Sequence, residues 1–163
     1  MAWHILEPII SWSYNTSISG WIRASKWAVA VLEVFHLFGL IFLLGSVFMI
    51  GLRCFGVVMR RDPVERIIRN LAPATLGGLG LMSVTGWLIF SSGATRYVDS
   101  KSFQVKMMFY AAAIIVQCAI YVIALRKKDE DHRRLNPIWM VLGGLAMVLW
   151  FGVGIAGRAI AFI

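Results

Sequence analysis

Four long runs of apolar residues constrain the fold of this chain more than any other feature of its sequence. A helix needs about 20 apolar residues to cross the roughly 30 Å hydrocarbon core of a bilayer. The runs that reach this length cover about residues 27–50, 73–90, 103–125 and 138–157. Because only short stretches join them, successive helices must run antiparallel. The sequence therefore predicts an all-α fold, a four-transmembrane-helix bundle, with residues 1–163 forming a single integral membrane domain.

The composition excludes several classes of function. Of the 163 residues, 60% are apolar and 15% are charged, whereas a soluble domain has about 45–50% apolar and about 25% charged residues. This difference argues against an ordinary cytosolic enzyme, a disordered tail and a nucleic-acid-binding module. The net charge of +8 therefore indicates basic loops beside a membrane rather than a nucleic-acid partner. Two cysteines, Cys54 and Cys118, are too few for a disulfide framework or a four-thiolate metal site.

The distribution of lysine and arginine predicts the orientation of the bundle. Ten of the 16 basic residues lie in the stretches 51–72 and 126–137, which join the first run to the second and the third to the fourth. Cytoplasmic loops carry an excess of basic residues. We therefore expect both ends of the chain on the outside, in the periplasm, and a multi-pass protein of the bacterial inner membrane.

The segment before the first run is expected to lie on the membrane surface. Residues 3–14 are rich in tryptophan and isoleucine, and Glu7 and Pro8 interrupt the segment. Tryptophan favours the membrane–water interface. The sequence therefore predicts an N-terminal interfacial helix here rather than a fifth span.

A helix start is predicted in the loop before the second run. Asp62 is expected to cap this helix, Pro63 to occupy its first position and Glu65 to bond back to the cap. Three apolar side chains would then face lipid, as in a surface helix that anchors the loop, namely Ile67, Ile68 and Leu71.

Four ionisable side chains lie inside the predicted spans, namely Glu33, His36, Lys106 and Arg158. Ionisable groups in a bilayer are costly and usually mark a functional site. In the predicted orientation all four belong to the outer half of the membrane, and Glu33 and His36 share a helix face. Three helices would thus bring an acid, an imidazole and two cations to neighbouring depths. The alternative is that Glu33 and His36 bond each other while Lys106 and Arg158 extend toward the headgroups.

Large side chains on the same helix faces predict a pocket among these groups. Its expected lining is Met82, Trp87, Tyr110, Met147 and Trp150. An apolar pocket rimmed by cations suits a flat ligand with acidic or carbonyl groups. Both haem b and quinone fit that description.

Haem would take its iron ligand from His36, which is the only histidine within a predicted span. Neutral imidazole is a common axial ligand, and lysine or arginine can pair with the propionates. The spans hold no second histidine. The sixth ligand would be one of the methionines, or His4 folded over the pocket, and five-coordinate iron is the other arrangement.

Short motifs along nearly the whole chain resemble an uncharacterised bacterial family of four-helix integral membrane proteins. They are Glu33-x-x-His36-x-x-Gly39, Gly45, Leu52-Arg53, Gly56, Pro73, Gly77-Gly78, Thr85-Gly86, Phe103-x-x-Lys106 and Gly157-Arg158. More distantly, the histidine of the first span and the lysine that opens the third are similar to copper-resistance D-type membrane domains and to the haem-binding four-helix membrane protoporphyrinogen oxidase. This resemblance implies that His36 ligates haem and that Lys106 lies near a propionate or a substrate carboxylate.

The expected function is a small membrane redox protein that passes electrons between a periplasmic partner and the quinone pool. In this hypothesis His36 ligates iron or hydrogen-bonds quinone, Glu33 orients His36 or accepts a proton, and Lys106 and Arg158 hold anionic groups. The alternative is a non-redox subunit of a larger complex, or an accessory protein for transport of copper or a small solute. The expected partners are the lipid bilayer and a membrane or periplasmic protein or a second copy of the chain, and the sequence leaves open whether the chain is an enzyme.

The predicted orientation can be checked by labelling introduced cysteines with a membrane-impermeant thiol reagent. Ser100→Cys should react in intact cells, because residue 100 belongs to the outer loop. Asp131→Cys should react only after the membrane is permeabilised, and the unsubstituted chain is the control. The opposite pattern would show that the bundle is inserted the other way round.

Overall fold

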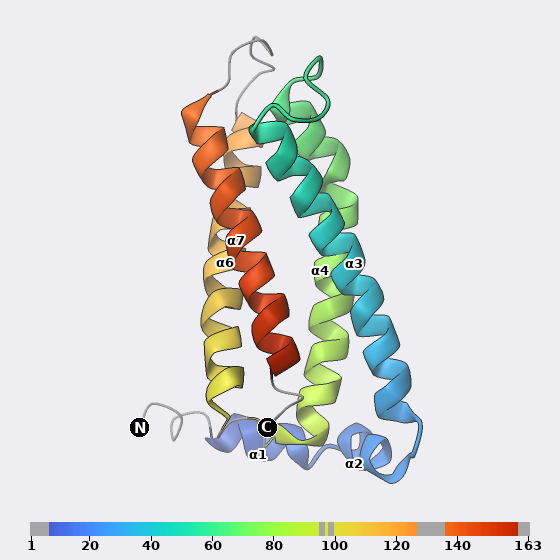
Figure 1. The fold of residues 1–163 in the computed structure, drawn as a ribbon. Coiled ribbons are helices and arrows are strands. Elements are labelled where there is room, and N and C mark those ends of the chain that lie inside the picture. Colours follow the sequence, from blue (N-terminus) through green and yellow to red (C-terminus); the bar gives the residue numbers. More distant parts are fainter. Residues whose placement is uncertain (1–6, 95–96, 98–99, 127–135, 160–163) are drawn as a thin grey trace.

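The computed structural model of the chain describes residues 7–94, 97, 100–126 and 136–159 (Figure 1). Its helices are α1 (Glu7–Tyr14), α2 (Ser17–Ala24), α3 (Ala28–Cys54), α4 (Val64–Ser92), α6 (Lys101–Arg126) and α7 (Pro137–Ala159). The four long helices, α3, α4, α6 and α7, are each long and apolar enough to cross a membrane. The all-α four-helix bundle and its four spans are therefore confirmed.

The four long helices form a closed ring. Helix α3 packs against α4 and α7, and α6 packs against the same two helices from the other side. Figure 1 shows α1 and α2 lying across the end of the bundle at which α3 begins. We call this the α1–α2 end, and it corresponds to the outer end of the predicted topology.

Two short helices stand where the sequence predicts one. Residues 3–6 of the predicted interfacial helix lie outside the described residues, and the described part divides after Tyr14. Thr16 caps α2, since its hydroxyl accepts a hydrogen bond from the Ser19 amide at 3.3 Å. The Ser19 hydroxyl donates to the Ser91 carbonyl at 2.7 Å and so fastens α2 to the end of α4. The tryptophans Trp12 and Trp21 are exposed, which fits an interfacial position.

Glycines set the closest contacts of α3. A β-carbon on Gly78 of α4 would lie 2.7 Å from both the Gly39 carbonyl oxygen and the Leu43 amide nitrogen of α3. Near the other end of α3, a β-carbon on Gly143 of α7 would lie 2.9 Å from the Cys54 β-carbon. Small residues let membrane helices approach closely enough for their backbones to touch. Helix α3 is thus held against α4 in one half of the bundle and against α7 in the other.

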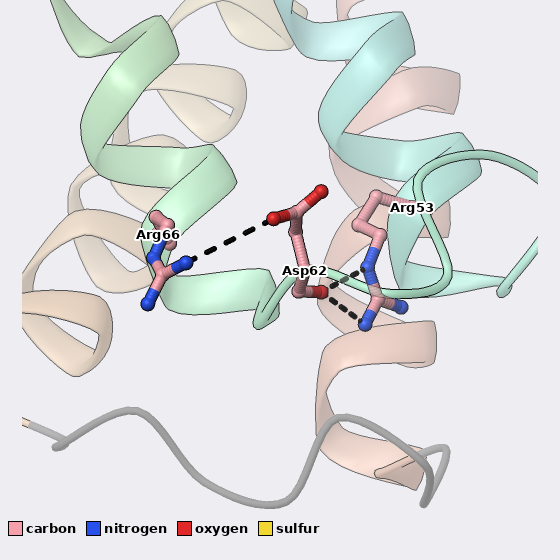
Figure 2. A network of polar contacts seen from close by, with 3 residues as sticks. All are labelled: Arg53, Asp62 and Arg66. Atoms are coloured by element: carbon pink, nitrogen blue, oxygen red, sulfur yellow. Dashed lines mark hydrogen bonds and ion pairs between the residues drawn. The ribbon is translucent and has the colours of Figure 1, made fainter.

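The loop between α3 and α4 is folded by backbone and arginine hydrogen bonds. At the end of α3, the Val57 amide bonds the Leu52 carbonyl and the Gly56 amide bonds the Arg53 carbonyl, each at 2.9 Å. This Schellman arrangement places Gly56 at φ 69°, which glycine adopts without strain. The buried Arg53 guanidinium then donates to the Asp62 carbonyl oxygen at 2.8 and 2.6 Å (Figure 2).

The start of α4 differs from the predicted one. Its N-cap is Pro63 without a side-chain cap bond, and the Asp62 carboxylate instead lies 3.9 Å from the Arg66 guanidinium (Figure 2). Glu65 is buried and accepts a hydrogen bond from the Trp139 indole of α7 at 3.0 Å, so the predicted bond back to the cap is wrong. Ile67 and Ile68 are buried as well. The predicted surface helix is therefore the first part of α4, which continues through Pro73.

The glycine contact between α3 and α4 leads to a stability prediction. Gly78→Ala should lower the free energy of unfolding by about 1–3 kcal/mol, because a methyl group there forces the two backbones apart. Gly80→Ala is the matched control on the same helix, since a β-carbon at Gly80 meets no atom within 4 Å. The measurement is unfolding by sodium dodecyl sulfate in mixed micelles. Equal midpoints for the two variants would show that the close contact does not limit packing.

Candidate functional site

His36 lies at the contact between α3 and α4. Its Nδ1 atom is 3.0 Å from the Thr85 hydroxyl oxygen, and its side chain is half-buried. The ring also packs on Gly86, where a β-carbon would lie 3.1 Å from the His36 Cε1 atom. A larger residue at position 86 would displace the imidazole.

The hydrogen bonds of Thr85 decide which nitrogen of His36 carries the proton. A threonine hydroxyl has one proton to donate, and the Thr85 hydroxyl lies 2.6 Å from the Leu81 carbonyl oxygen. The hydroxyl therefore accepts from His36, so Nδ1 carries the hydrogen. The backbone of Met82 also faces the ring as a hydrogen-bond acceptor.

This tautomer leaves a lone pair on the His36 Nε2 atom. Nε2 has no hydrogen-bond partner among the described residues. A histidine that ligates a metal usually donates its other ring N–H to a protein oxygen, which fixes the ring orientation. The Nδ1–H bond to Thr85 does this here. Nε2 is thus available to ligate iron or to accept a proton.

Lys106 of α6 supplies a cation near the same site. Its side chain is half-buried, and its amine lies against α7, since a β-carbon on Gly157 would be 3.5 Å from the Lys106 Nζ atom. The charge of Lys106 acts electrostatically on the His36 ring across the bundle. No hydrogen bond or ion pair joins Lys106 to any of the described residues. Because a charged amine at membrane depth is costly without a counter-charge, this position suits an anionic or carbonyl group of a ligand.

The other two predicted ionisable residues lie differently. Arg158 follows Gly157 on α7 and is exposed near the end of that helix. Glu33 is exposed on α3, and the structure does not bring it to His36, whose ring bonds Thr85 instead. Residues three apart on a helix point about 60° apart around its axis. That angle turns Glu33 to the outside of the bundle while His36 faces α4.

Tyr110 and Trp150 lie together in the interior of the bundle. Their rings meet edge to face at 5.9 Å, and Trp150 is fully buried. The Tyr110 and Ser83 hydroxyls are 2.7 Å apart, and the Trp150 indole donates to the Gln117 side-chain oxygen at 3.3 Å. These residues therefore join α4, α6 and α7 rather than forming one wall of an open pocket.

The remaining predicted lining residues are spread over the bundle. Met82 is buried one turn from Thr85. Trp87 is 46% exposed and packs on Phe90 at 5.8 Å, so it faces outward. Met147 contacts Gly51, which lies fifteen residues beyond His36 on α3, about 22 Å along the helix axis. The structure therefore brings Met82 close to His36 but places Trp87 and Met147 elsewhere.

An apolar groove lies near His36 at the α1–α2 end. It has a volume of about 310 Å³ and lies between α2, α3 and α4, with Trp21, Trp27, Leu32 and Leu88 among its lining residues. Leu32 is one turn of α3 before His36, and Leu88 is one turn of α4 after Thr85. The lining of the groove therefore includes residues one helical turn from His36 and Thr85. No pattern in the sequence predicts this groove, because it depends on how α2 folds against α3.

Comparison of the chain with known protein families, curated proteins and solved structures finds no match. Among the described residues, no three or more histidine, cysteine, aspartate or glutamate side chains are grouped as a metal site. The functional argument therefore depends on the geometry of His36, Thr85 and Lys106.

The tautomer of His36 can be measured by long-range ¹H–¹⁵N correlation spectra of the protein in micelles. We expect a protonated Nδ1 and an unprotonated Nε2. Thr85→Val removes the acceptor and should weaken this preference, and it should cost about 1–3 kcal/mol of stability because Nδ1–H loses its partner. Thr75→Val, far from the ring on the same helix, is the control for the tautomer alone, because Thr75 has buried hydrogen bonds of its own to lose. A protonated Nε2 in the unsubstituted protein would contradict the assignment.

Proposed function

We propose that this chain is a small membrane redox protein that binds a quinone or haem b near its α1–α2 end, through His36 and Lys106. It would pass electrons between a periplasmic partner and the quinone pool of the bacterial inner membrane. The observation that carries the proposal is the pairing of an unengaged imidazole nitrogen with an unpartnered amine across the bundle. An apolar bundle gains nothing from two such groups unless a ligand uses them.

The residues fit haem in part. His36 Nε2 has the lone pair that an axial ligand needs, and Lys106 is the nearby cation that would pair with a propionate. Arg158 is a second cation on α7. Met147 of α7 contacts Gly51, about 22 Å along α3 from His36, and is therefore too far away to be a second ligand to the same iron. The site therefore favours a haem with one histidine ligand over a haem held by histidine and Met147.

The residues fit a quinone more completely. His36 Nε2 can accept a hydrogen bond from a quinol hydroxyl, and Lys106 can donate to the opposite oxygen. The apolar groove beside Leu32 and Leu88 offers a path for an isoprenoid tail from the bilayer to the site. The polar groups and the groove together favour quinone over haem.

The redox chemistry belongs to the bound group, and the chain supplies position and charge. A quinone carries electrons together with protons, whereas haem iron carries electrons alone. His36 would accept a proton at Nε2 when the quinol form is oxidised, and Thr85 would keep the ring oriented for this transfer. Lys106 would stabilise negative charge on the oxygen that it contacts.

One observation favours a second function, that of a non-redox subunit of a larger complex. Glu33 is exposed on α3 within a span, and no interaction joins it to a described residue. A carboxylate that faces lipid is costly, so the side chain of a neighbouring protein would cover it.

The proposal is tested on protein purified from bacteria that make both haem and quinone. Visible spectra of the oxidised and dithionite-reduced protein report haem, and organic extraction followed by chromatography reports quinone. We expect close to one bound cofactor per chain, and His36→Ala should lose it. Lys106→Met should weaken binding about 10–100-fold, as expected when a charge-assisted hydrogen bond is lost.

Lys101→Met is the matched control for Lys106→Met. Lys101 is exposed at the first residue of α6, so its loss should leave cofactor content unchanged. A correctly folded protein that carries neither cofactor would overturn the redox proposal and favour the subunit function. Equal cofactor content in the Lys106→Met and Lys101→Met proteins would remove Lys106 from the site.

A further inference from the structure

A cluster of polar side chains lies inside the bundle, away from His36. Its members come from all four long helices and are Ser46 of α3, Thr75 of α4, Gln117 and Tyr121 of α6, and Trp150 of α7. Ser46, Thr75, Gln117 and Trp150 are each at most 5% exposed. No bulk water reaches such a position in a bilayer, so these groups must find partners inside the protein.

Two of the polar atoms in this cluster have no partner in the protein. They are the Gln117 Nε2 atom and the Tyr121 hydroxyl, and both are buried. The Gln117 amide is fixed by Trp150, whose indole donates to Oε1 at 3.3 Å, and a flipped amide would face that donor with its own N–H group. Nε2 is therefore held toward the centre of the cluster with its hydrogens unused.

The unpartnered atoms lie close to one another and to Thr75. The Tyr121 hydroxyl faces the Thr75 and Gln117 side chains as hydrogen-bonding neighbours, but its contacts with them fall short of direct hydrogen-bond geometry. The Thr75 oxygen lies 2.8 Å from the Ser46 oxygen and 3.0 Å from the Leu71 carbonyl oxygen, so its proton is taken and a lone pair remains free. Two donors and one acceptor are thus neighbours inside the bundle.

We propose that the bundle binds an internal water molecule between Tyr121, Gln117 and Thr75. The water accepts hydrogen bonds from the Tyr121 hydroxyl and from Gln117 Nε2–H, and it donates one to the Thr75 oxygen. These three bonds give it the number of polar partners that buried waters typically have. The inference is independent of the proposed redox function, because none of these residues belongs to the His36 site.

The bound water would complete a hydrogen-bonded chain across the bundle. The chain runs from Trp150 through Gln117 and the water to Thr75 and Ser46, and so it joins α7, α6, α4 and α3. The Ser83–Tyr110 bond already joins α4 to α6. The water would add a further link between the α6–α7 pair and the α3–α4 pair.

Hydroxyl-radical labelling tests the proposal, since ionising X-rays produce radicals from bound water inside a protein. In the full-length protein in micelles, Tyr121 should be oxidised at least several-fold faster than Tyr110, whose hydroxyl is bonded to Ser83. Gln117→Leu should reduce the Tyr121 rate to that of Tyr110, with circular dichroism used to verify the helical fold. Equal rates for Tyr121 and Tyr110 in the unsubstituted protein would overturn the proposal.

The stability of Tyr121→Phe gives a second readout that needs no labelling. Removing a hydroxyl that bonds a water should lower the unfolding midpoint in sodium dodecyl sulfate. Removing a hydroxyl that is buried without any partner should raise it. A raised midpoint would therefore also overturn the proposal.

Discussion

A polar group inside a bilayer cannot turn to water, so every such group must be satisfied within the protein. Helix α4 meets this requirement in a regular way. The hydroxyls of Thr75, Ser83 and Thr85 each lie within hydrogen-bond distance of the carbonyl four residues earlier. The same three oxygens then contact Ser46, Tyr110 and His36 on neighbouring helices. Helix α4 therefore carries a row of hydroxyls that bond both its own backbone and side chains of neighbouring helices.

Because α4 satisfies its hydroxyls so regularly, the polar groups of the bundle that have no partner are informative. Some polar groups have no hydrogen-bond partner in the described part of the chain, among them His36 Nε2, the Lys106 amine, the Gln117 Nε2 atom and the Tyr121 hydroxyl. A sequence that satisfies its hydroxyls so regularly has no physical reason to leave a charge and an imidazole unsatisfied by accident. A water molecule can satisfy the neutral Gln117 amide. The Lys106 cation and the His36 lone pair instead suit a ligand that both accepts and donates hydrogen bonds.

The rigid contact between α3 and α4 gives the His36 site its geometry. Gly39 and Gly78 bring the two backbones together one to two turns from His36, and Gly86 leaves room for the ring itself. A site built on tightly packed helices holds its groups more precisely than a site on loops. Lys106 comes from the other helix pair, α6 and α7, which contacts α3 through its opposite half. The distance between Lys106 and His36 is therefore set by the angle between the two pairs.

Hydropathy was enough to predict the four spans, because their length follows from the thickness of the bilayer. It was not enough to predict that the helix starting near Pro63 and the span starting at Pro73 are one helix. The residues before Pro73 are buried rather than on the membrane surface, among them Glu65, which bonds Trp139, 74 positions away in the chain. No local sequence pattern can predict a partner that far away in the chain. The division of the interfacial segment into α1 and α2 depends in the same way on Ser19 bonding the end of α4.

The candidate site could likewise be predicted from the sequence only in part. The cost of ionisable groups in lipid was sufficient to select His36 and Lys106 from the sequence, and that cost is independent of the fold. The rotation of each helix about its own axis could not be predicted from the sequence. That rotation turns Glu33 away from His36 and turns Trp87 to the outside of the bundle. The bond of Thr85 to His36 was not predicted, because the hydroxyl of a helical threonine normally hydrogen-bonds its own backbone. It does so here as well, and that bond to Leu81 is what compels His36 to donate through Nδ1 and to present Nε2 as a free lone pair.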